Sequence, residues 1–84
     1  MTPLTTLKNL GPKSREWLEA VGIHTAEDVV ELGAVEVYRR LKAAFPDRVS
    51  LNALWGLQAA IMNIHWKDLP PEIKQDLLSE LNTS

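Results

Sequence analysis

The stretch LKNLGPKSREWLEAVGIHTAED, residues 7–28, decides the fold of this chain. Its pattern predicts a short helix, a tight turn at Asn9-Leu10-Gly11, a second helix and a glycine exit into a third. Pro12 suits the first position of the second helix. Such a turn points backbone N–H groups and a helix N-terminus outward, which favours binding of a phosphate or carboxylate. The same shape also serves as a scaffold that only sets the angle between two helices.

The chain continues as helices, because apolar residues recur at helical spacing and almost never alternate. The second helix should end near Val21, where Gly22 supplies a left-handed C-cap. Thr25 is the expected N-cap of a helix over 26–32 that stops at Gly33. Asp28 resembles the acidic member of a capping box at this start. Three residues of this helix are expected inside: Val29, Val30 and Leu32.

A further helix is expected to start at Ala34 and to end before Pro46. Its apolar stripe consists of Ala34, Tyr38, Leu41 and Phe45. Ser50 is the expected cap of the next helix, over 51–63, whose middle carries no charge. A helix that is apolar on most sides lies at the centre of a core or in an interface. Trp66, with Leu69 and Pro70, is expected to pin the last helix, which starts at Pro70-Pro71, to the core.

Composition bounds the possible functions. The chain has 84 residues, 45% of them hydrophobic and 24% charged, which is typical of one folded domain over 1–84. It has no cysteine, so disulfides and thiolate metal sites are excluded. No segment approaches the roughly 20 apolar residues of a membrane span, and the start lacks a signal-peptide pattern. We therefore expect a cytoplasmic protein that does not bind membranes.

Charge is segregated along the chain. The net charge of −2 argues against a dedicated nucleic-acid coat protein. One segment is nevertheless basic, with Arg39, Arg40, Lys42 and Arg48 against a single acid. These side chains form either a patch for nucleic acid or an acidic partner, or the solvated face of an amphipathic helix.

The segment from Leu7 to Asp28 resembles the helix-hairpin-helix motif, in which two helices flank a Gly-hydrophobic-Gly hairpin often followed by Pro-Lys. Here the hairpin reads Asn9-Leu10-Gly11 and then Pro12-Lys13. Asparagine replaces the first glycine, and it is the residue best able to adopt the same left-handed conformation. Arg15 replaces the small residue that usually follows.

The chain more specifically resembles the C-terminal domain of TfoX-type (Sxy) bacterial competence regulators. The resemblance rests on three blocks, NLGPKSREWLEAVGIHTAEDV at 9–29, LGAVEVYRRLKA at 32–43 and LNALWGLQAAIMNIHWKDLP at 51–70. Fuller members of this family carry an additional N-terminal domain before this one. The resemblance implies a role in regulating competence or transcription, without catalysis. We expect an all-α fold, a single compact orthogonal bundle of five or six short helices with a helix-hairpin-helix-like unit.

Two sets of residues are candidates for binding. The candidate nucleic-acid site, which would contact DNA backbone without sequence preference, consists of Leu10, Gly11, Lys13, Lys8 and Arg15. The candidate partner site, which would bind another protein or a second copy in a homodimer, consists of Trp55, Arg39 and Arg40. Trp55 belongs to a second apolar flank of helix 51–63, together with Leu51 and Met62.

No catalytic or metal-binding arrangement is predicted. His24 and His65 are far apart in the chain, and neither belongs to a metal-ligand spacing. No nucleophile triad or phosphate-binding glycine loop is present in the sequence. We expect no metal, no cofactor and no small-molecule substrate. The favoured function is a non-catalytic module that binds proteins or itself, and the alternative is weak DNA binding through the 9–14 hairpin.

Overall fold

The computed structural model describes residues 11–83, and all regular elements in this range are helices. They are α1 (Pro12–Ala20), α2 (Ala26–Leu32), α3 (Ala34–Ala44), α4 (Leu51–Met62), the 3₁₀ helix η2 (Trp66–Asp68) and α5 (Pro71–Thr83). The all-α prediction is therefore confirmed. The first helix of the expected hairpin unit lies outside the described residues.

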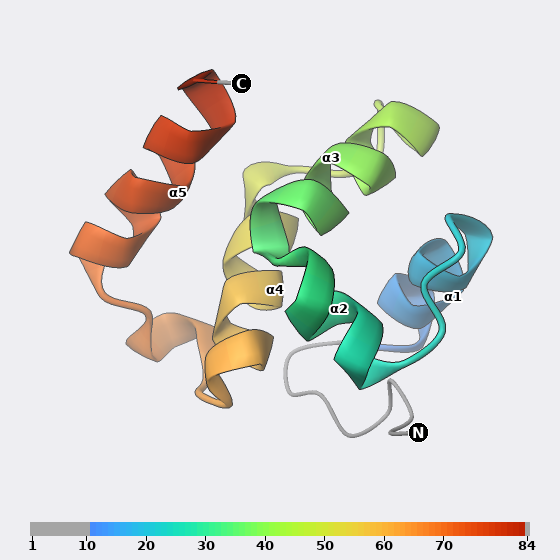
Figure 1. The fold of residues 1–84 in the computed structure, drawn as a ribbon, viewed down its shortest axis with the longest axis horizontal. Coiled ribbons are helices and arrows are strands. Elements are labelled where there is room, and N and C mark those ends of the chain that lie inside the picture. Colours follow the sequence, from blue (N-terminus) through green and yellow to red (C-terminus); the bar gives the residue numbers. More distant parts are fainter. Residues whose placement is uncertain (1–10, 84) are drawn as a thin grey trace.

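The helices form a compact bundle around the α3–α4 pair. In Figure 1, α3 and α4 occupy the centre, α1 lies on one side and α5 on the other. The helices run in several directions and do not align in an up-and-down bundle (Figure 1). This arrangement places α1 and α5, which hold different groups of charged residues, on opposite sides of the molecule.

Every α-helix contributes side chains to one hydrophobic core. Its fully buried side chains are Leu18, Ile23, Val29, Val37, Leu54 and Leu57. Leu77 of α5 is also buried and joins the same cluster. Because the largest buried residues come from α1 to α4, α5 is attached to a core that the other helices build.

The end of α1 forms the glycine cap that the sequence predicts. The Ile23 N–H donates to the Leu18 carbonyl at 2.9 Å, and the Gly22 N–H donates to the Glu19 carbonyl at 3.1 Å. These two bonds define a Schellman motif, which needs a residue with positive φ. Gly22 has φ 84° and meets that need without steric cost. Ile23 packs under the helix end, as expected.

The start of α2 confirms the predicted capping residues. The Thr25 hydroxyl oxygen accepts a hydrogen bond from the Asp28 N–H at 3.2 Å. In return, the Asp28 carboxylate accepts from the His24 N–H at 3.3 Å, one residue before the cap. This bond from His24 is the main cause that lowers the pKa of Asp28. At the other end, Gly33 with φ 85° stops α2 and directly precedes α3.

Two local expectations are wrong, and one holds in position only. Val30 is 54% exposed, because its side of α2 faces away from the core. Trp66 is 43% exposed and is not a core residue, whereas Leu69, which was expected to share its role, is only 5% exposed. Ser50 is the N-cap of α4, as expected, but its side chain makes no capping hydrogen bond.

Candidate interaction surfaces

The candidate nucleic-acid residues lie at the start of α1, and the structure describes only some of them. Lys8 and Leu10 lie outside the described residues. Gly11 is the N-cap of α1 with an extended backbone, and its carbonyl accepts the Arg15 N–H at 3.1 Å. Lys13 is exposed and Arg15 is half-buried. The N–H groups of the first turn of α1 have no partner within the helix, as at any helix N-terminus.

A hollow lies between the start of α1 and the start of α4. The hollow has a volume of about 280 Å³, and its polar lining residues are Ser14, Arg48, Ser50 and Asn52. Ser14 belongs to the first turn of α1, whereas Ser50 is the N-cap of α4. Arg48 therefore lines the same hollow as the first turn of α1. The sequence did not predict this placement, because Arg48 and α1 are far apart in the chain.

Three basic residues of the 39–48 segment have different hydrogen-bond partners. The Arg39 Nη2 donates to the Glu80 carbonyl of α5 at 3.0 Å. Arg40 pairs with Glu36 on α3 at 2.9 Å, the i,i+4 pairing of an exposed helix face. Each guanidinium therefore already has an acceptor within the protein.

Lys42 stabilises the loop between α3 and α4. Its ammonium group donates to the Pro46 carbonyl at 2.9 Å and to the Val49 carbonyl at 2.7 Å. These bonds hold the loop that carries Arg48 against the end of α3. Arg39, which contacts α5, lies away from Lys13, which belongs to α1 (Figure 1).

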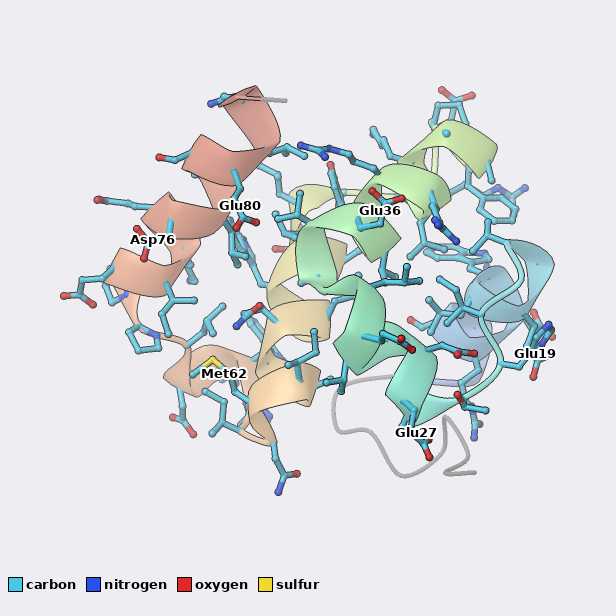
Figure 2. All side chains as sticks on the ribbon, viewed as in Figure 1. Glu19, Glu27, Glu36, Met62, Asp76 and Glu80 are labelled. Atoms are coloured by element: carbon cyan, nitrogen blue, oxygen red, sulfur yellow. The ribbon has the colours of Figure 1, made fainter. Side chains whose placement is uncertain are left out.

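Trp55 is half-buried and packs against the core cluster. The Lys74 ammonium of α5 lies 5.6 Å from its ring centroid, a cation–π arrangement that covers part of the indole. Leu51 and Met62, on the same flank, are exposed at the two ends of α4. Figure 2 labels Met62 at the lower end of that helix. The apolar flank predicted for α4 therefore exists, but α5 interrupts its middle.

The other two tryptophans have different surroundings. Trp17 stacks on Phe45 with ring centroids 5.7 Å apart, which ties α1 to the end of α3. The exposed Trp66 ring stacks on His65 at 6.0 Å, and the Lys67 ammonium lies 5.8 Å from it. His65 also accepts the Lys67 N–H through Nδ1 at 3.2 Å. His65 is therefore a hydrogen-bonded structural residue, as expected.

A groove with a volume of about 670 Å³ lies between α3 and α5. Its apolar lining residues are Leu32, Ala34, Val35, Ile73 and Leu77. Its charged lining residues are Glu36, Arg39, Asp76 and Glu80. Figure 2 shows Glu36 on α3 and Asp76 and Glu80 on α5. Sequence reasoning had placed Arg39 in a partner site, but it did not predict the acidic residues beside it.

No group of three or more His, Cys, Asp or Glu side chains in residues 11–83 is placed to hold a metal ion. None of the helices in the same range has the length and apolar character needed to cross a membrane.

Comparisons with known proteins agree with this architecture. The sequence model described as the TfoX C-terminal domain matches residues 1–81. "DNA transformation protein TfoX1" of Aliivibrio fischeri is 26% identical over 78 residues, which cover 93% of this chain. The match covers 37% of the length of that curated relative, so the chain spans well under half of it.

The fold also matches a solved structure. The crystal structure of an uncharacterized protein from Listeria monocytogenes superposes with a TM-score of 0.85 and 25% sequence identity. The superposition covers 95% of this chain and 90% of that one. Since the family match extends over nearly the whole sequence, the chain belongs to the TfoX C-terminal domain family.

Proposed function

We propose that this chain is a non-catalytic interaction module of a regulator of DNA transformation, and that it binds a protein partner or a second copy of itself. The observation that carries this proposal is the groove between α3 and α5, which combines apolar walls with charged residues. Such a combination is typical of surfaces that recognise protein segments. The link to transformation comes from the name of the curated relative.

Two further features support the proposal. The family model that matches residues 1–81 is described as a domain of TfoX, and this description names no reaction. The lack of cysteine in the sequence suits a reducing compartment, so we place the module in the cytoplasm.

Co-purification tests the binding of a protein partner. The tagged chain is compared with the variant Asp76→Lys, which alters the groove, and with Glu19→Lys, which makes the same charge change on α1. We expect a defined protein to be retained by the unchanged chain and by Glu19→Lys. Sedimentation over a range of concentrations tests self-association in parallel. Absence of both a retained protein and self-association would contradict the proposed function.

The second candidate function is weak binding of DNA backbone through the 9–14 hairpin. The observation that favours it is the hollow between the starts of α1 and α4, where Arg48 lies beside Ser14. Helix N-termini and a nearby guanidinium attract phosphate. Nonspecific binding of this kind reaches a Kd of about 10⁻⁴–10⁻⁶ M at physiological salt, and an acidic protein falls at the weak end.

Fluorescence anisotropy with duplex DNA tests this second function. We expect binding that weakens between about 50 and 200 mM salt, because phosphate contacts release counterions. Lys13→Glu and Arg48→Glu should abolish binding, whereas Lys74→Glu, on the opposite side of the molecule, should leave a measurable interaction. Equal effects of all three variants would indicate that only net charge matters and would contradict a site at α1.

A further inference from the structure

The groove between α3 and α5 has an apolar floor that is already fixed by the core. Val35 and Leu77 lie in the groove and are themselves nearly buried in the hydrophobic cluster. Ile73, one turn before Leu77 on α5, is partly exposed at the same surface. Because the floor is anchored in the core, the groove exists without a ligand and its walls need little rearrangement to receive one.

An acidic row borders this groove along α5. Glu72, Asp76 and Glu80 are all exposed and follow one another at intervals of four residues, so they lie along one face of the helix. Like charges at this spacing destabilise a helix. The one basic residue of α5, Lys74, lies over the Trp55 ring and does not interrupt the row. The row therefore costs helix stability.

Asp76 supplies the groove with a carboxylate from α5. Three carboxylates and one guanidinium line the groove. Glu36 is paired with Arg40, and Arg39 donates to the Glu80 carbonyl. The Asp76 carboxylate makes no ion pair or hydrogen bond with another residue in the range 11–83. A cation bound over the apolar floor can therefore pair with Asp76, which Figure 2 labels on α5.

We propose that the groove between α3 and α5 docks a basic amphipathic segment of a protein partner. The apolar side chains of that segment pack on Ile73 and Leu77, and one of its lysine or arginine side chains faces the Asp76 carboxylate. This is recognition of a helix in a groove, with charge complementarity that selects basic over acidic segments. The inference rests on the proposed function and specifies the chemistry of the partner.

A second copy of this chain fits the groove less well. The basic residues Lys13 and Arg48 lie around the start of α1, on the opposite side of the molecule from α5 (Figure 1). A copy that used them would dock head to tail, and such contacts extend into open chains unless the rotation closes a ring. A partner protein that brings its own basic segment pairs with the same carboxylates, and the resulting complex does not extend into a chain.

An NMR titration tests the inference with a defined probe. The probe is the peptide KLLKLLKKLLKLLK, which forms a basic amphipathic helix, and its matched control is ELLELLEELLELLE. We expect the basic peptide to shift the amide signals of residues that line the groove on α3 and α5. The acidic peptide should leave those signals unchanged. Shifts centred on α1, or equal shifts with both peptides, would overturn the inference.

Two charge-reversal variants distinguish binding of the peptide in the groove from its general attraction to an acidic protein. Asp76→Lys should weaken binding of the basic peptide by about tenfold or more, because it removes the carboxylate beside the apolar floor. Glu19→Lys changes the net charge equally, but Glu19 lies on α1, far from the groove in Figure 2, and it should have little effect. Equal weakening by both variants would overturn the inference. Both substitutions are at exposed helix positions, and far-UV circular dichroism confirms that the variants fold.

The outcomes distinguish this inference from the proposed function on which it rests. If a partner protein co-purifies equally with the unchanged chain and with Asp76→Lys, the groove assignment is wrong and the proposed function stands. If groove signals shift with protein concentration in the absence of peptide, the occupant is a second copy and the inference is wrong. If no protein partner and no self-association are found, the proposed function itself fails.

Discussion

At the residue scale, Asp28 shows how a short stretch of sequence fixes a local electrostatic state. The carboxylate accepts the His24 N–H, and Thr25 accepts the Asp28 N–H, so both sides of the cap are satisfied. The bond from the His24 N–H favours the charged carboxylate and is the main cause that lowers its pKa below the ordinary value of 3.8. The position at the start of α2 adds a favourable interaction with the helix dipole.

The cap therefore predicts a pH dependence of stability. A carboxylate whose pKa is lower in the folded state stabilises the fold above its unfolded pKa, and that contribution is lost as the pH falls through the folded pKa. We expect the unchanged chain to be more stable than Asp28→Asn at about pH 6, with the difference closing towards about pH 2. Urea unfolding of both proteins at each pH measures this difference in the free energy of unfolding. A difference that stays constant over this range would contradict the assignment.

The connector before α5 gives a second prediction at this scale. Leu69 is buried, whereas Trp66 is largely exposed. Leu69→Ala should lower the free energy of unfolding by about 2–5 kcal/mol, because it leaves a cavity in a packed site. Trp66→Ala should cost less than Leu69→Ala, since 43% of the Trp66 surface is already in solvent. Denaturant unfolding of the two variants measures both values, and the reverse order would show that the indole is the anchor.

At the element scale, the loop between α3 and α4 depends on one side chain from the preceding helix. Lys42 donates to two loop carbonyls, those of Pro46 and Val49, across the end of α3. A lysine near a helix C-terminus is also favoured by the helix dipole. This arrangement keeps Val49 buried and sets where α4 begins.

Removal of that ammonium group should destabilise the loop. Lys42→Met, which keeps the aliphatic stem, should lower the free energy of unfolding by about 1–2 kcal/mol, because two charge-assisted bonds are lost. The matched variant Arg40→Met breaks an exposed i,i+4 pair and should cost no more than about 0.5 kcal/mol. Thermal unfolding of the two variants compares the loss of stability that each substitution causes. Similar costs would mean that solvent replaces the Lys42 bonds.

At the scale of the whole molecule, one core joins all the α-helices, although α5 shares less of it. Leu54 and Leu57 of α4 are fully buried at its centre, while α5 contributes the buried Leu77 at its edge. The Arg39 bond to the Glu80 carbonyl adds a second link between α3 and α5. The groove that carries the proposed function lies along this junction.

A shared core predicts cooperative unfolding. The thermal transitions followed by tryptophan fluorescence and by far-UV circular dichroism should coincide, because small single domains unfold in one step. Trp17 reports on α1 and Trp55 on the α4–α5 contact. If α5 unfolded separately, fluorescence and helix content would change at different temperatures. That outcome would show that the groove opens before the rest of the fold is lost.

The sequence alone determined the helices and their ends. Helical spacing, Pro12, Gly22, Thr25 and Gly33 identified the starts and stops, because such signals act within one or two turns of the chain. The same local reasoning placed Val29 inside and found the Glu36–Arg40 pair. The resemblance in three sequence blocks identified the family, and the match over residues 1–81 confirmed it.

Only the tertiary structure decided which side chains share a surface. The sequence gives no rule for which side chain of a short connector faces inward, so Trp66 and Leu69 were both expected inside and only Leu69 is buried. Arg48 lines one hollow with residues of α1, and Glu36 and Asp76 line one groove, although these residues are distant in the chain. Local signals fix dihedral angles, whereas the packing of helices fixes which faces meet, and a binding surface depends on the second.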